Sequence, residues 1–319
     1  MSGVDGQNDP EDVTPAIGMQ QDKAQAATPE SFLHVLEQTQ ERINKRSGRN
    51  LLLAVGIGLV LGLVFLGSLV FVKELFLVFL AIAIAIGAYE FAQALRAQQR
   101  DVPRIASMIG VIAQSFAAYY FNNLGQIVAL GAAIAFVLLW RTAELLRKSH
   151  RTGTQALFFD FGASILVQVY LGFLLSFAAL LLRHEHGELW VIAFVVTVVC
   201  VDTSALFAGV LWGKHKFVPK ISPSKTWEGF LGSIVAGVIA GVCFALFLLD
   251  QPWWVGGILG LAMVASATIG DLSESLIKRD LGIKDMSGFL PGHGGFMDRL
   301  DSMLPSCLMA YIVFSAFVL

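Results

Sequence analysis

The chain has 319 residues and a formal net charge of −2; 56% of its residues are hydrophobic and only 14% are charged. Soluble proteins average roughly 45–50% apolar and about 25% charged residues. The composition, with a mean hydropathy of +0.70, therefore excludes an ordinary water-soluble protein and predicts one embedded in lipid. The near-neutral charge does not indicate a nucleic-acid partner. Three widely spaced cysteines inside apolar runs fit neither a disulfide framework nor a metal site.

Residues 1–49 form a polar segment before the first apolar run, which begins at Leu51. Residues 1–29 have almost no large apolar side chains, so we expect a largely disordered tail. Apolar residues then recur near helical spacing from Phe32 to Ile43 and end in a basic cluster. This pattern predicts either a short amphipathic helix on an anionic membrane surface or a loosely helical linker. Because no short apolar stretch with a cleavage site stands near the start, the first span is expected to be retained.

The rest of the chain, residues 50–319, is predicted to be an all-α transmembrane catalytic domain. Its apolar runs are long enough to cross about 30 Å of hydrocarbon, and we predict about nine spans. The third span is diluted by polar side chains such as Gln114. The predicted spans are residues 50–71, 74–95, 104–121, 124–142, 160–182, 189–211, 228–249, 253–270 and 302–319.

The lysines and arginines predict the orientation. With the N-terminus in the cytoplasm and nine alternating spans, 20 of the 22 basic residues fall on the cytoplasmic side, leaving only Lys73 and Arg183 outside. Basic residues are enriched in cytoplasmic loops. The bias therefore predicts a cytoplasmic N-terminus and an outside C-terminus, and it brings two polar loops, about 213–228 and 271–301, to the same cytoplasmic face.

The longer loop carries most of the chemistry. Between Asp271 and Asp301 it contains six acidic residues, four basic residues, one histidine and five glycines. A 31-residue loop of this composition is typical of a functional site, although a solvated, salt-bridged connection is the alternative. Asp271, Ser275 and Lys278 have the spacing of one helix face. Asp298 and Asp301 also share a face if the last helix begins there.

Carboxylates on two helices at the membrane edge can share a magnesium ion, which prefers one or two carboxylates together with phosphate oxygens. The glycines around His293 allow close approach of the backbone to a phosphate. Four basic residues of the loop supply compensating charge, so this chemistry predicts a magnesium–triphosphate site. The predicted basic residues are Lys278, Arg279, Lys284 and Arg299.

Two further features come from other segments. Ser222, Lys225 and Thr226 can bind phosphate oxygens, although an interfacial turn anchored by Trp227 also explains this sequence. Asp202 lies within a predicted span, and an acid in that position is a functional candidate unless it is neutral and hydrogen-bonded between helices.

Two glutamates near the ends of predicted spans are not expected to be part of the site. For Glu90 and Glu144 we expect ordinary ion pairing with Arg96 and Arg141, or exposure at the interface.

These motifs resemble the phosphatidate cytidylyltransferase family. The segment from Ser275 to Asp301, which includes Lys278-Arg279, Leu290-Pro291-x-His293-Gly294-Gly295 and Asp298-Arg299-Leu300-Asp301, is similar to the family signature without a gap. Residues 222–229, SPSKTWEG, resemble its second motif. Asp202, Ala205, Gly209, Gly213 and Lys214 resemble a third. That motif departs at Leu206 and Val210, where the family often has an aromatic and a basic residue. The resemblance covers roughly the C-terminal 120 residues.

The resemblance implies that CTP and phosphatidate react to give CDP-diacylglycerol and pyrophosphate, with Mg2+ and with or without a second cation. It places the protein in the inner (plasma) membrane of a bacterium, with the site facing the cytoplasm, and suggests a homodimer. Alternatives are a CTP-dependent transferase acting on another lipid phosphate, a CTP-dependent lipid kinase, and a transporter. The expected metal ligands are Asp271, Asp298 and Asp301. The other expected catalytic residues are Lys278, Arg279, Arg299 and Asp202. The expected substrate-binding residues are Ser222, Lys225, Thr226, Ser275, Lys284, His293, Gly294 and Gly295.

Overall fold

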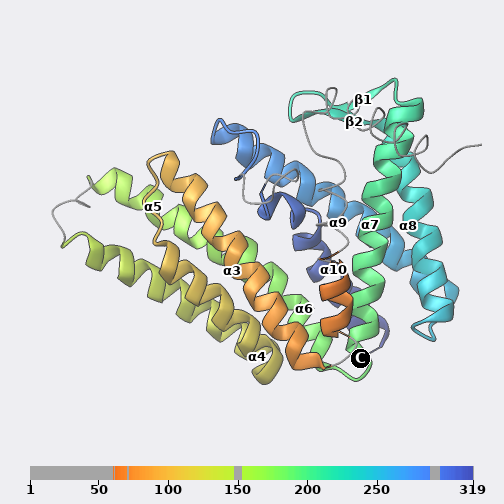
Figure 1. Ribbon diagram of the computed structural model, residues 1–319, viewed down its shortest axis with the longest axis horizontal. Coiled ribbons are helices and arrows are strands. Elements are labelled where there is room, and N and C mark those ends of the chain that lie inside the picture. Colours follow the sequence, from red (N-terminus) through yellow and green to blue (C-terminus); the bar gives the residue numbers. More distant parts are fainter. Residues whose placement is uncertain (1–59, 61, 70–71, 147–152, 288–294, 319) are drawn as a thin grey trace, which may run out of the picture. The chain divides into compact units, whose positions relative to one another are not determined.

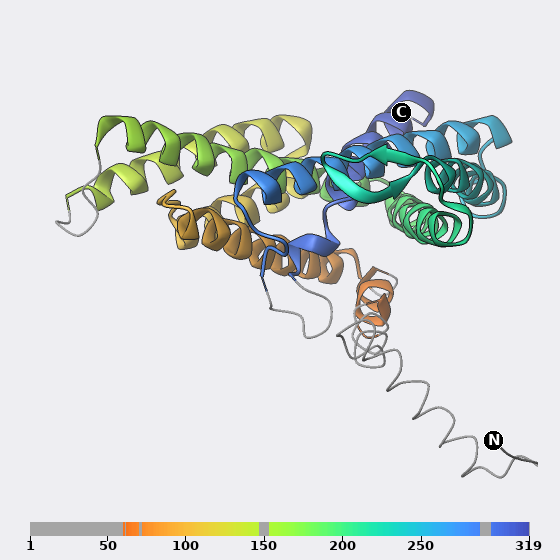
Figure 2. The same ribbon diagram turned by 90° about the horizontal axis from the view of Figure 1, so that it is seen from above.

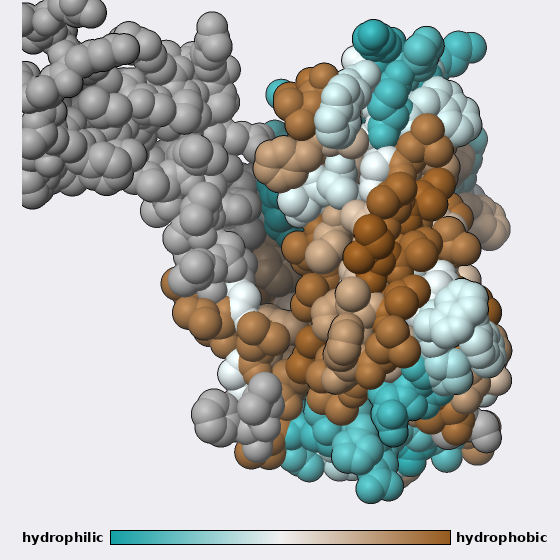
Figure 3. All heavy atoms as spheres, turned by 90° about the vertical axis from the view of Figure 1, so that its right-hand side faces the viewer, coloured by the Kyte–Doolittle hydropathy of each residue, from teal (hydrophilic) through white to brown (hydrophobic). Residues whose placement is uncertain are grey.

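The computed structural model describes residues 60, 62–69, 72–146, 153–287 and 295–318, which are mainly helical, as predicted. Six of the described helical segments are long and apolar enough to cross a membrane, and the apolar helix α10 (Met303–Phe317) is shorter. Figure 3 shows a hydrophobic band between hydrophilic ends on one face of the molecule. The six are α3 (Lys73–Ala97), α4 (Arg104–Glu144), α5 to α6 (Thr154–Arg183), α7 (Gly187–Trp212), α8 (Trp227–Phe247) and α9 (Trp253–Asp280).

Helix α4 consists of two arms that fold back on each other. Asn122, in its middle, has φ 60° and ψ −159°, which is far from helical. A Cβ atom on Gly110 would lie 3.1 Å from the Cβ of Ala133, whereas 23 residues of straight helix span roughly 34 Å. The two arms correspond to the predicted spans 104–121 and 124–142. The total of nine spans stays a prediction, because most of 50–71 lies outside the described residues.

Gln114, a polar side chain of the third predicted span, bonds to a glutamine of another span inside the bundle. Gln114 Nε2 donates to Gln168 Oε1 at 2.9 Å, and Gln168 Nε2 donates to the Ser107 carbonyl at 3.2 Å. Gln168 begins a π-helical turn, η2 (Gln168–Phe173), between α5 (Thr154–Val167) and α6 (Leu174–Arg183). Interhelical amide bonds of this kind stabilise membrane helices against one another.

A buried ion pair joins the end of α4 to α5. The Arg141 side chain is completely buried, and its Nη2 and Nε lie 2.8 and 3.1 Å from Oδ2 of Asp160. Asp160 Oδ1 accepts the Asp101 backbone N–H at 2.8 Å, and Asp101 Oδ2 lies 3.3 Å from Arg141 Nη2. The guanidinium therefore holds together two helices and the connection before α4.

The C-terminal half of the domain contains α7, α8, α9 and α10. Helix α8 packs against both α7 and α9, and α10 contacts α6, α7 and α9 (Figure 1). Strands β1 (Lys216–Val218) and β2 (Ser222–Thr226) form an antiparallel hairpin between α7 and α8 (Figure 2). Its Phe217 ring stacks on Phe230 and meets Trp227 edge-on, which fixes the hairpin on the first turn of α8. The sequence did not predict this hairpin.

Helices α8 and α9 touch through glycines. Each helix contributes two that are four residues apart, Gly237 and Gly241 on α8 and Gly256 and Gly260 on α9. A Cβ on Gly241 would lie 2.2 Å from the Gly256 carbonyl oxygen, and one on Gly260 would lie 2.2 Å from that of Gly237. Small residues at this spacing allow membrane helices to approach closely. The two backbones are therefore in direct contact.

We expect Gly260→Val to destabilise the protein by about 1–3 kcal/mol or more, because the new side chain must push α8 away from α9. The matched control is Gly257→Val on the same helix, where an added Cβ meets nothing within 4 Å. Thermal unfolding in detergent measures both variants. Equal midpoints for the two would contradict the close contact.

Candidate active site

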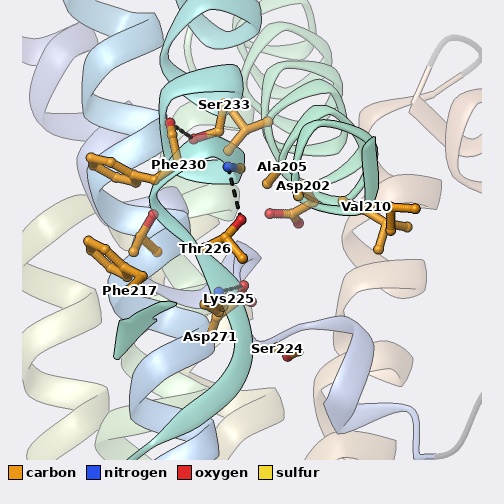
Figure 4. Close-up of a pocket in the computed structure, with 15 residues that line it drawn as sticks. Asp202, Ala205, Val210, Phe217, Ser224, Lys225, Thr226, Phe230, Ser233 and Asp271 are labelled. Carbon is orange, nitrogen blue, oxygen red and sulfur yellow. Dashed lines mark hydrogen bonds and ion pairs between the residues drawn. The ribbon is translucent and has the colours of Figure 1, made fainter. Parts of the chain in front are cut away.

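A cavity of about 320 Å³ lies between α7, α8, α9 and strand β2 (Figure 4). It brings together residues from two of the motifs, Asp202 from α7 and Lys225 and Thr226 from β2, with Asp271 of α9, which stands four residues before the signature segment. The two departures from the family pattern, Leu206 and Val210, also line it and are largely exposed. The cavity thus has polar groups inside and apolar side chains at its rim.

The charged groups of the cavity already have partners, either within the cavity or beside it. The Lys225 ammonium forms an ion pair with the Asp271 carboxylate, as Figure 4 shows. Asp202 Oδ2 accepts a hydrogen bond from Ser302 Oγ, just before α10, at 2.8 Å. Asp202 lies ten residues before the end of α7, which places it about 15 Å along the helix from that end. Asp202 therefore lies deeper in the predicted membrane than the end of α7 that is predicted to face the cytoplasm.

The small residues of the second and third motifs allow α7 and α8 to pack around Thr226. Thr226 caps α8 by accepting the Gly229 N–H at 3.1 Å, and a threonine in this role can still donate its own hydroxyl proton. A Cβ on Gly209 would lie 3.2 Å from Thr226 Oγ1, and one on Gly229 would lie 2.7 Å from the Ala205 carbonyl oxygen. These glycines hold Lys225 and Thr226 beside Asp202.

Asp301 and Glu274 extend the acidic centre toward α10. Asp301 interacts electrostatically with both Asp202 and Asp271. Burial, together with the Asp271 charge, raises the pKa of the Asp301 carboxyl. Glu274, one turn after Asp271 on α9, is completely buried, and its Oε2 lies 3.6 Å from Lys278 Nζ. Glu274 was not among the predicted site residues, although its spacing from Asp271 and Lys278 places all three on one helix face.

A second cluster is organised by Asp298. Lys278 Nζ donates to Asp298 Oδ1 at 3.0 Å, and the backbone N–H groups of Met286 and Gly295 donate to Oδ2 at 3.1 and 2.8 Å. Burial acts to raise the pKa of Asp298, but the Lys278 ammonium and the hydrogen bonds to the carboxylate, including that from the Gly295 N–H, together hold the pKa below its usual range. Asp298 therefore ties residues on either side of the 288–294 segment to α9.

The remaining predicted residues are distributed around these clusters. Arg279 donates from Nε to the Ile221 carbonyl at the hairpin turn, and Ser222 lies in β2 with its Oγ 3.4 Å from that of Ser224. Ser275 lies on α9. Lys284 is exposed. Arg299 lines a separate, mainly apolar cavity. His293 and Gly294 lie outside the described residues.

The last helix does not extend back to Asp298, which was the condition for Asp298 and Asp301 to share a helix face. Asp298 lies in a 3-10 turn, η3 (Met297–Arg299), and α10 begins at Met303, close to the predicted start of the last span. The expectation for Glu90 was wrong. Glu90 is neither exposed nor paired with Arg96 among the described contacts. It is buried, with 3% exposure, and bonds to Ser287 and Met297. Glu144 does lie near Arg141, with 3.9 Å between Oε2 and Nη1.

The donor set around the cavity fits a divalent cation. The acids Asp202, Asp271 and Asp301 interact through their charges, and clustered hard oxygen donors are what Mg2+ prefers. Within the described ranges, no three His, Cys, Asp or Glu side chains are arranged to hold a metal ion by themselves. Because nucleotide-bound Mg2+ commonly takes one or two carboxylates and completes its shell with phosphate oxygens and water, the individual ligands stay a prediction.

Most of the chain is similar to a known protein family. Residues 53–317 match the model of the cytidylyltransferase family. The chain belongs to this family. The match covers the N-terminal spans as well as the motifs, so it extends the resemblance beyond the C-terminal 120 residues. It also confirms the enzyme class, a nucleotidyltransferase.

Individual relatives agree with the family match. A phosphatidate cytidylyltransferase of Mycobacterium bovis is 38% identical over 273 residues, which cover 84% of this chain and 89% of that protein. That of Mycobacterium leprae is 38% identical over 274 residues, covering 83% and 88%. That of Helicobacter pylori is 32% identical over 243 residues, covering 76% and 84%. With its bacterial relatives and long apolar helices, this cytidylyltransferase-family member is a bacterial integral membrane protein.

Proposed function

We propose that this protein transfers CMP from CTP to phosphatidate and so makes CDP-diacylglycerol and pyrophosphate. The observation that carries the proposal is the cavity in which Lys225 pairs with Asp271 beside Asp202, between membrane-spanning helices. The names of the relatives supply the two substrates. A lipid phosphate and a nucleotide both need cationic groups, and the acyl chains need the apolar surroundings that the rim provides.

In the proposed reaction, an oxygen of the phosphatidate phosphate attacks the α-phosphorus of CTP. A new P–O bond forms in line with the bond to the β-phosphate, which breaks, and pyrophosphate leaves. The attacking phosphate is already anionic, so the reaction needs no general base. Catalysis in phosphoryl-type transfer is mainly positioning and charge stabilisation.

Different residues supply the charge stabilisation and the positioning in the proposed reaction. Lys225 and Lys278, from β2 and α9, neutralise phosphate charge at the two ends of the acidic centre. Arg279 and Arg299 are proposed to assist at the cytoplasmic side. Magnesium, when bound, would neutralise charge on the triphosphate, held by Asp271 and Asp301 together with phosphate oxygens. Asp298, with its carboxylate engaged by Lys278, Met286 and Gly295, supports the site mainly by fixing the backbone around it.

The lipid substrate is proposed to enter from the side of the bilayer. Leu206 and Val210 are 65% and 75% exposed at the rim of the cavity, one and two turns after Asp202 on α7. An acyl chain can remain against these side chains while its phosphate reaches Lys225. We further propose that the site faces the cytoplasm across the inner membrane, as the distribution of basic residues suggests. We also propose that the protein forms a homodimer, as the family resemblance suggests.

The test is an assay of purified protein in detergent with Mg2+, phosphatidate and CTP labelled at either the α- or the γ-phosphorus. We expect label in the lipid only from the α-position. Label from the γ-position would identify a lipid kinase instead, and none from either position would refute the proposal. Asp298→Ala should reduce the rate strongly because it frees Lys278 and both flanking N–H groups. Replacing phosphatidate by another lipid phosphate tests the acceptor.

A further inference from the structure

The buried Glu90 connects the N-terminal half of the domain to the signature segment. It lies on α3, nearly 200 residues before that segment in the chain, and only 3% of its surface is exposed. A buried carboxylate is costly unless its oxygens are hydrogen-bonded. What bonds to Glu90 therefore indicates why a carboxylate is placed there.

Each oxygen of Glu90 accepts one hydrogen bond, and the two donors lie on opposite sides of residues 288–294. Ser287 Oγ donates to Oε1 at 2.5 Å, and the Met297 backbone N–H donates to Oε2 at 2.8 Å. Met297 is itself completely buried. Glu90 thus fixes the chain on both sides of residues 288–294.

Asp298 bonds to neighbouring positions on the same two flanks. It accepts N–H groups from Met286, next to Ser287, and from Gly295, close to Met297. Glu90 and Asp298 therefore form a double clasp, in which each carboxylate joins one flank to the other. Asp298 also accepts a hydrogen bond from Lys278 of the proposed active site, whereas Glu90 belongs to α3.

Gly295 is pressed between the two carboxylates. A Cβ atom there would lie 2.8 Å from Asp298 Oδ2, 3.0 Å from the Ser287 nitrogen and 3.3 Å from Glu90 Oε2. A side chain would therefore displace at least one side of the clasp. The glycine at this position of the signature is explained by this packing as well as by any contact with phosphate.

We propose that Glu90 is a positioning residue for the cytidylyl-transfer site, which sets the backbone on both sides of residues 288–294 and, through Asp298, the position of Lys278. The role in catalysis rests on the proposed function; the clasp itself does not. Neither Glu90 nor Ser287 needs to touch a substrate for this role. Loss of the clasp should weaken catalysis and leave the helices folded.

Hydrogen exchange tests the clasp independently of activity. In the full-length protein in detergent, Glu90→Ala should speed exchange of the Met297 amide at least tenfold, because its acceptor is gone, while amides in the middle of α8 stay unchanged. Glu74→Ala, which changes an exposed glutamate on the same helix, serves as the matched control. Unchanged exchange at Met297 in Glu90→Ala would overturn the proposal. Failure of this test differs from failure of the proposed function, which is read from the assay alone.

Kinetics then test the positioning role. We expect Glu90→Ala to lower kcat/KM at least tenfold and Ser287→Ala to lower it about threefold. The double variant should be no worse than Glu90→Ala, because the hydroxyl has lost its acceptor. Glu90→Gln retains one acceptor oxygen and should recover part of the activity. Multiplicative effects in the double variant, or wild-type kcat/KM in Glu90→Ala, would overturn the proposal. If Glu90→Ala does not fold, Ser287→Ala and Glu90→Gln with their double variant complete the same cycle.

Discussion

Replacing Asp271 by asparagine is expected to lower kcat by roughly a hundred- to a thousand-fold. Asp271 forms the ion pair with Lys225, interacts with the charges of Asp202 and Asp301, and is a proposed magnesium ligand. An asparagine has nearly the same shape but no charge, so it removes both the partner of Lys225 and the anionic metal ligand. The measurement is initial rate against Mg2+ concentration. We expect the variant to need more Mg2+ as well as to turn over more slowly.

The matched control is Asp280→Asn. Asp280 is the last residue of the same helix and is exposed. It should keep wild-type kcat and the same Mg2+ dependence. If both variants lost activity equally, the effect would lie in α9 as a whole. If Asp271→Asn kept wild-type kcat, Asp271 would have no part in catalysis.

Arg141→Met is expected to destabilise the protein by about 3–5 kcal/mol, because it leaves the buried Asp160 carboxylate without its cation. Arg141 is fully buried and Asp160 is 1% exposed, so water cannot replace the lost partner. Thermal or denaturant unfolding in detergent measures the change. Activity at a temperature where the variant is folded should change much less than stability, since the pair lies outside the proposed active site.

A second substitution separates the buried charge from lost packing. Arg141→Met combined with Asp160→Leu should recover most of the stability, because replacing a whole buried pair by apolar residues is often neutral. Arg183→Met, which changes an exposed arginine at the end of α6, should stay within about 0.5 kcal/mol of wild type. A double variant no more stable than Arg141→Met would show that the pair matters through more than its charges.

The sequence predicted the helices well because each long apolar run must become a helix in lipid. Even the third span was predicted despite Gln114, whose amide bonds to Gln168 rather than to water. The hairpin was missed because its strands are short, polar and lack clear alternation. Its stability comes from contacts such as Phe217 on Phe230, which a local pattern does not reveal.

The sequence grouped Asp271 with Lys278 but overlooked Glu274 on the same helix face, and it gave no means of finding contacts between distant segments. The spacing of Asp271 and Lys278 on α9 was sufficient to group them. No spacing relates Glu90 to Met297, because they meet only when α3 packs against the signature segment. Glu90 was therefore interpreted from its neighbour Arg96, and that local interpretation was wrong. The assignment of metal ligands stays a prediction.

The glycine contacts between α8 and α9 have a consequence for how the enzyme works. With the two backbones touching at Gly241–Gly256 and at Gly237–Gly260, neither helix can slide past the other without a steric clash. Lys225 stands just before α8 and Asp271 lies on α9, so the register of these helices sets the distance between the two charges. The cation and the acid are thus preassembled before any substrate arrives. Substrate binding therefore has little to organise between these two charges, whereas the exposed rim on α7 is not held by these glycine contacts.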